Sequence, residues 1–198
     1  MCYSYEASVF AGSVSYISSF ILMTRNQGYD RWLALFILSF SSIQWAEAAL
    51  WKNLDNVEMN QFITSWIIPI ILASEGLTAL LGANLYHDID PYLWLLYIII
   101  ALILIFSVNK ASITTIGNGS LSWGPNDKIY LHILFTVYLV LPFCLYMEDN
   151  LDKITITFGV IAILMYSIIN KNKSISSNWC YYANALSMYA LVRPHIHI

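Results

Sequence analysis

Charge is scarce in this sequence. Charged residues make up only 11% of its 198 residues, and the formal net charge at pH 7 is −3. Soluble domains average about 25% charged residues, so this chain has too little charge to cover a water-facing surface. The lack of a basic excess also argues against a nucleic-acid-binding face.

Cysteine and histidine are also few. Three cysteines, Cys2, Cys144 and Cys180, form an odd number, which does not indicate a complete disulfide framework. Neither a C-x-x-C nor an H-E-x-x-H sequence occurs. We therefore predict no metal site and no cofactor.

Long apolar runs are what the sequence has in abundance. Hydrophobic residues make up 59% of the chain, and a membrane-spanning helix needs about 20 mostly apolar residues. The sequence predicts an all-α, polytopic integral membrane protein, with one transmembrane helical domain over residues 1–198. Its seven predicted spans are Glu6–Met23, Trp32–Trp51, Ile63–Tyr86, Tyr92–Val108, Ile129–Met147, Ile154–Ile169 and Trp179–Val192. The seventh is the weakest, and an interfacial position is its alternative.

The longest predicted loop covers residues 109–128. Two turn sequences, at 117–120 and 124–127, flank a short stretch that favours a strand. We expect a small hairpin over one mouth of the bundle. Alternation of seven spans places the N-terminus and the second, fourth and sixth loops on one side, called side A, and the remaining loops on side B. Basic residues number five on side A and four on side B, which weakly favours a cytoplasmic side A.

Glu75 is the most unusual residue of the predicted spans. It lies about 12 residues into the third span, or roughly 18 Å deep. A carboxylate at such a depth costs roughly 2.5–3.5 kcal/mol on the mildest scale. We therefore expect Glu75 to be neutral or hydrogen-bonded and to face the interior, near a kink at Pro69. A buried structural glutamic acid is the alternative. The predicted partners are Ser39, Ser41, Gln44 and Asn184.

Other polar residues gather on side A. Gln44 and Glu47 are three residues apart and share a helix face. The candidates for ligand binding or transport are Glu75, Glu47, Gln44, Glu6, His132, Cys2, Cys180, Asn184 and Trp123. Simpler alternatives are a headgroup position for Glu6 and Glu47, helix–helix contact for Gln44, and a structural histidine at His132.

Four stretches resemble a group of small, uncharacterised multispan membrane proteins found in bacteria and in large DNA viruses. They are Met1–Ser8 (M-C-x-S-x-E-x-S), Gln44–Glu47 followed by Trp51, Thr114–Trp123, and Ser177–Cys180. The resemblance implies an integral membrane location, in a host or virion membrane if the protein is viral. It also implies that Cys2, Glu6, Glu47, Trp123 and Cys180 act together, and it implies no particular activity. The group often has Gln-Pro where this chain has Ser74-Glu75, so no role carries over to Glu75.

These features favour a small-solute or ion channel or transporter, with proton coupling as one form of it. The expected partners are the lipid bilayer and a small solute or ion, and oligomerisation is left open. One alternative is an intramembrane lipid-modifying enzyme that uses a glutamate, His132 and a thiol, which we rank below transport. A ligand-binding seven-span receptor and a structural viral membrane protein are further alternatives. A retinal protein is excluded, because Trp179–Val192 contains no lysine.

Overall fold

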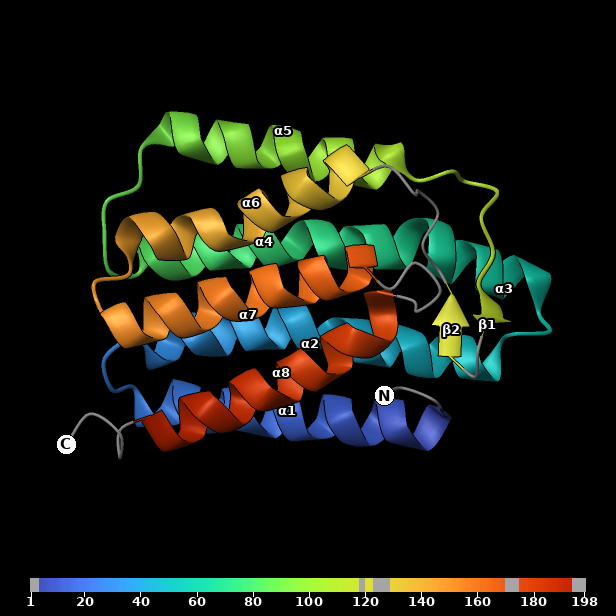
Figure 1. Ribbon diagram of the computed structural model, residues 1–198, viewed down its shortest axis with the longest axis horizontal. Helices are drawn as coiled ribbons and strands as arrows, with labels where there is room; N and C mark the ends of the chain where they lie inside the picture. Colours follow the sequence, from blue (N-terminus) through green and yellow to red (C-terminus); the bar gives the residue numbers. More distant parts are fainter. Residues whose placement is uncertain (1–3, 118–119, 123–128, 170–174, 194–198) are drawn as a thin grey trace.

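Helices form over every predicted span in the computed structural model, which describes residues 4–117, 120–122, 129–169 and 175–193. They run alternately up and down and lie side by side in one elongated bundle (Figure 1). The elements are α1 (Tyr5–Arg25), α2 (Asp30–Lys52), α3 (Val57–Phe62), η1 (Ile63–Ile67), α4 (Ile68–Asn84), α5 (Pro91–Ser107), β1 (Thr115–Gly117), β2 (Ser120–Ser122), α6 (Ile129–Tyr146), α7 (Asn150–Ile169) and α8 (Ile175–Val192).

Local sequence signals explain the helix ends. The Ser4 hydroxyl accepts a hydrogen bond from the backbone N–H of Ala7 (3.1 Å) and caps the start of α1. Asn26 ends that helix in the left-handed conformation, with φ at 50°. Pro91 is the first residue of α5, where its missing N–H costs no helical hydrogen bond.

The third span departs from prediction at its start. Its helical segment begins at Val57, six residues before the predicted Ile63, because the Asn56 side chain caps it by accepting from the Met59 N–H. The π-helical turn η1 ends at Ile67, two residues before Pro69. Proline has no N–H to donate to the carbonyl four residues earlier, so the regular hydrogen-bond ladder is interrupted here.

The predicted hairpin in the 109–128 loop is confirmed. Strands β1 and β2 pair antiparallel, with Thr115 opposite Ser122 and Gly117 opposite Ser120. The hairpin lies at the end of the bundle where α1 begins and α2 ends, which is side A (Figure 1). The last described turn of α8 lies at the opposite end, side B.

Two apolar clusters fill the bundle. The larger is rich in aromatic rings: Trp32 stacks on Phe143 with ring centroids 5.0 Å apart, and Phe36 packs edge-on against Phe143. The smaller lies at side A, where Leu121 of the hairpin joins Ile43 and Leu50 of α2. The hairpin is therefore packed into the bundle and does not merely lie on it.

The outer surface is unusually apolar. In α5 only Tyr97 and Ala101 are buried, so most of its leucine and isoleucine side chains face outward. Within the described residues, three helices are long and apolar enough to cross a membrane: Tyr5–Arg25, Asp30–Lys52 and Val57–Asn84. Helix α5 and residues Tyr130–Tyr146 are apolar but shorter.

Candidate functional site

Glu75 lies inside the bundle, as its sequence position suggested. Only 2% of the residue is exposed, and its Oε2 atom has no hydrogen-bond partner among the described residues. The ring of Tyr138 lies against the same turn of α4, because a Cβ placed on Gly76 would be only 2.2 Å from that ring. The Tyr138 hydroxyl donates to the carbonyl of Ala73. The Tyr138 side chain therefore lies close to Glu75, but its hydroxyl hydrogen is donated to the Ala73 carbonyl and not to the glutamate.

The four predicted partners of Glu75 hydrogen-bond to other groups or lack a partner. Ser39 pairs with the Ser74 hydroxyl at 2.8 Å, and the Ser41 hydroxyl donates to the carbonyl of Ile37, four residues earlier in α2. Asn184 accepts from Ser15 at 3.2 Å. The prediction of these partners was wrong, because Ser and Asn side chains can satisfy themselves on neighbouring backbone or hydroxyl groups within the helix pairs.

Gln44 is a second buried polar side chain without partners. It is fully buried, and neither its amide nitrogen nor its amide oxygen has a hydrogen-bond partner within the described part of the chain. Glu75 lies at the level of Ser39 in the bundle, because its neighbour Ser74 hydrogen-bonds to Ser39. Gln44 is five residues further along α2 than Ser39, which is about 7.5 Å along the helix axis. Gln44 and Glu75 are therefore separate polar groups in the side-A half and the middle of the bundle.

The remaining side-A candidates lie in different environments. Glu47 is buried at 1% exposure and has an interaction partner. Glu6 is exposed in the first turn of α1, near the end of α2, where the Lys52 ammonium lies 4.1 Å from the Tyr5 ring centroid. His132 is half-buried in the first turn of α6 and also has an interaction partner.

Three candidates lie outside the described residues. Cys2 and Trp123 belong to such segments, and the same holds for the side chain of Cys180, although its backbone is part of α8. That Cys2, Glu6, Glu47, His132 and Cys180 form one layer therefore stays a prediction.

A buried hydrogen-bond network fixes the side-A loop to α3 and η1. Asn60 donates from Nδ2 to the Thr114 carbonyl (2.9 Å) and accepts from the Thr114 N–H at Oδ1 (2.8 Å). The Thr64 and Thr114 hydroxyls are 2.7 Å apart. These reciprocal bonds hold the strand that leads into the hairpin.

Lys110 completes that network at the helix interruption. Its ammonium donates to the carbonyl of Ser65 (2.9 Å), the carbonyl that Pro69 cannot serve, and to the carbonyl of Ile105 at the end of α5 (2.7 Å). It also lies 3.9 Å from the ring centroid of Trp66. Desolvation lowers the pKa of Lys110.

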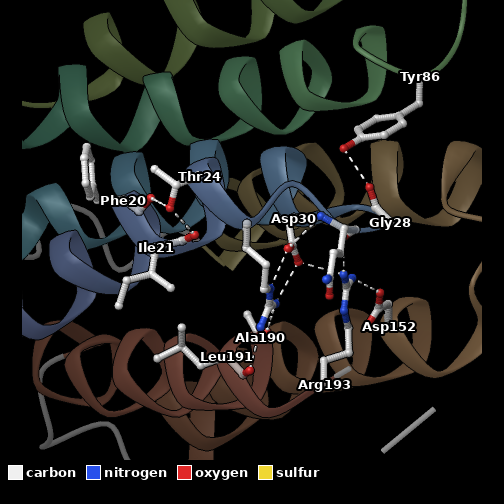
Figure 2. Close-up of polar contacts among 12 residues, drawn as sticks. Phe20, Ile21, Thr24, Gly28, Asp30, Tyr86, Asp152, Ala190, Leu191 and Arg193 are labelled. Carbon is white, nitrogen blue, oxygen red and sulfur yellow. Dashed lines mark hydrogen bonds and ion pairs between the residues drawn. The ribbon is translucent and has the colours of Figure 1, made fainter. Parts of the chain in front are cut away.

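Side B carries an ion cluster formed by Arg25, Asp30, Asp152 and Arg193, in which Arg25 is partly exposed and the other three residues are buried. Arg25 binds Asp30 through two nitrogens, at 2.7 and 2.8 Å. Arg193 bridges the two carboxylates, reaching Asp30 at 2.8 Å and Asp152 at 2.6 Å. Figure 2 shows Asp30, Asp152 and Arg193 converging between the helices. Tyr189 adds a hydroxyl that donates to Asp152 at 2.7 Å.

Sequence reasoning missed this cluster, although it placed Arg25 and Arg193 on side B. The signal was present: Asp30 and Asp152 stand in the first turns of α2 and α7, while the arginines end α1 and follow α8. On alternating spans, all four of those positions belong to side B. What the sequence did not show is that the four side chains meet and that Asp30, Asp152 and Arg193 are buried there.

Comparison with models of known families, with curated proteins and with solved structures found no match for this chain. Within the described residues, no three His, Cys, Asp or Glu side chains gather as a metal site would require. In the described residues, the Glu75 carboxyl and the Gln44 amide are buried groups that can bind a proton or form hydrogen bonds.

Proposed function

We propose that this protein is a seven-span integral membrane protein. Its support is the combination of three helices long enough to cross a membrane with an apolar outer surface. Leu95 and Ile99 of α5 and Phe158 of α7 are 55%, 45% and 71% exposed. Exposed apolar surfaces of this extent mark interaction with a membrane or with a protein partner. A bilayer surrounds a helix bundle on all sides, whereas a protein partner covers one face, so we infer that lipid covers this surface.

Within that membrane, we propose that Glu75 binds a proton and that the protein moves protons or a proton-coupled small solute. The observation that carries this is the buried Oε2 atom of Glu75, which has no hydrogen-bond partner within the part of the chain that the structure describes. An ionised carboxylate without a cation is costly in this setting, whereas a neutral acid is tolerated. A nearby positive charge or water would stabilise the ionised carboxylate, and Glu75 would then release its proton. The residue is therefore suited to alternate between a protonated and an ionised state.

The proposal is tested in proteoliposomes with a pH-sensitive dye inside and an imposed pH gradient. We expect the wild-type protein to dissipate the gradient and Glu75→Gln, which cannot ionise, to abolish that flux. Glu58→Gln is the matched control, because Glu58 is an exposed carboxylate in the first turn of α3. Wild-type protein without proton flux would overturn proton movement by the protein alone, and a fully active Glu75→Gln would overturn the role of Glu75.

The topology is tested separately with single cysteines at Asp55 and Glu148, both exposed residues at the bundle ends. In sealed vesicles a membrane-impermeant maleimide should reach only one of the two. Labelling of both from the same side would contradict a seven-span arrangement.

A further inference from the structure

A tyrosine of α6 reaches the backbone of α4 at the turn that carries Glu75. The glycine that follows the glutamate, Gly76, makes this approach possible, because even a Cβ there would lie 2.2 Å from the Tyr138 ring. The phenol hydroxyl donates to the carbonyl of Ala73, in the same turn of the helix. Tyr138 and Glu75 are close enough to interact electrostatically. A buried phenol therefore lies beside the buried carboxyl.

The Tyr138 ring is held in this position by packing. Its centroid is 4.8 Å from that of the Tyr97 ring on α5, and the Tyr97 hydroxyl donates to the Tyr138 carbonyl at 3.0 Å. Both tyrosines are buried. Rotation of a hydroxyl hydrogen moves no heavy atom, so a phenol can change its acceptor while its ring stays packed. The packing therefore fixes the ring of Tyr138 without fixing the acceptor of its hydroxyl.

The acceptor that Tyr138 uses in this structure does not depend on the phenol. Ala73 lies inside α4, where the backbone N–H four residues later is the regular partner of its carbonyl. Hydrogen bonds to ionised groups are roughly twice as strong as those between neutral groups. Once Glu75 is ionised, donation by the phenol to the carboxylate is therefore favoured over donation to Ala73.

The helices around α4 offer few other groups that could stabilise an ionised Glu75. Those that pack along it are α2, α5 and α6. No titratable side chain occurs on α2 from Trp32 to Ala46, and those of α5 are Tyr92 and Tyr97. The remaining titratable side chains of α6 are at least six residues from Tyr138, about 9 Å or more along the axis: Tyr130, His132, Cys144 and Tyr146. In these three helices, Tyr138 is the titratable residue that contacts α4 beside the glutamate.

We propose that Tyr138 is the hydrogen-bond donor that positions and stabilises Glu75 in its ionised form. This inference rests on the proposed proton-binding role of Glu75. When the carboxyl gives its proton to water or to a solute, the glutamate side chain turns toward the phenol, and the Tyr138 hydroxyl donates to the carboxylate in place of the Ala73 carbonyl. The O–H bond of Tyr138 stays intact throughout. When a proton returns to Glu75, the hydroxyl donates to Ala73 again.

The test follows the protonation of Glu75 by infrared spectroscopy of the full-length protein in nanodiscs over a series of pH values. The C=O band of the protonated Glu75 carboxyl is the one that is absent from Glu75→Gln. In Tyr138→Phe the ionised form loses its donor, so the midpoint pH of this band should rise by roughly 1 to 2 units, the shift that corresponds to about 1.5–3 kcal/mol. A fluorinated tyrosine at position 138 keeps the ring and is a stronger donor, so it should lower the midpoint.

Two controls separate this role from a general change in packing. Tyr97→Phe removes the neighbouring buried phenol hydroxyl. Thr78→Val removes a hydroxyl that donates to the backbone carbonyl of Glu75 at 2.9 Å and is a competing donor for its carboxylate. Both controls should leave the midpoint pH unchanged. An unchanged midpoint in Tyr138→Phe or in the fluorinated protein, or an equal shift in either control, would overturn the role of Tyr138.

The infrared result and the proton-flux assay can fail separately. Proton flux with the same midpoint in wild type and Tyr138→Phe would leave the role of Glu75 intact and remove that of Tyr138. The expected shift in a protein without flux would leave the Tyr138–Glu75 pair intact and remove the transport function. A carboxyl band that persists at every pH in the wild type would remove the ionised state of Glu75 and overturn both proposals.

Discussion

Replacement of Glu75 by leucine should stabilise the protein. The carboxyl is 2% exposed and its Oε2 has no partner in the described residues. Burial of an unpaired polar group costs roughly 1–3 kcal/mol in protein mutational data. Leucine removes that cost without creating a cavity, so Glu75→Leu should raise the free energy of unfolding by about 1–3 kcal/mol. Glu75→Gln keeps a buried polar group and should change it by less than about 1 kcal/mol.

The assay is denaturant unfolding in lipid–detergent micelles, followed by far-ultraviolet circular dichroism. Ser74→Ala is the matched control on the same helix, because the Ser74 hydroxyl is 2.8 Å from that of Ser39. Loss of that paired hydroxyl should lower the free energy of unfolding by roughly 0.5–1.5 kcal/mol. The two neighbouring substitutions should thus shift stability in opposite directions. If Glu75→Leu instead destabilises by about 2 kcal/mol or more, the carboxyl has a partner and the reasoning fails.

Four further substitutions test the packing and the side-A network. Gly76→Ala would place a methyl group 2.2 Å from the Tyr138 ring and should lower the free energy of unfolding by about 1–3 kcal/mol. Gly12→Ala, which meets the partly exposed Trp45 at 2.9 Å, should cost less in the same unfolding assay. Asn60→Ala leaves the N–H and carbonyl of Thr114 unpaired. Hydrogen exchange at the Thr114 amide should then accelerate roughly tenfold or more, and an unchanged rate would show that Asn60 does not hold the loop. Lys110→Met removes the donor to the Ser65 and Ile105 carbonyls, so limited proteolysis in the segment after α5 should become faster than in Lys153→Met, a control at a half-buried lysine in the first turn of α7.

Much of the fold was determined by local sequence. Runs of apolar residues predicted where helices form, and each predicted run corresponds to a helix, with ends that differ mostly by a few residues. The turn sequence at 117–120 gave the hairpin. The depth of Glu75 within its run also indicated a buried carboxyl, because a residue in the middle of a long apolar helix has no route to surface water.

Other features depended on how the helices are rotated and paired. The sequence offered Ser39 and Asn184 as partners for Glu75, yet Ser39 meets Ser74 and Asn184 meets Ser15. Likewise, it placed Arg25 and Arg193 on side B, but only the packing of α1, α2, α7 and α8 brings them to Asp30 and Asp152. The pattern of apolar residues indicates which side chains are buried, because that pattern is set by residues within one or two helical turns of each other. The choice of partner is made between atoms far apart in the chain, and the tertiary structure alone brings those atoms together.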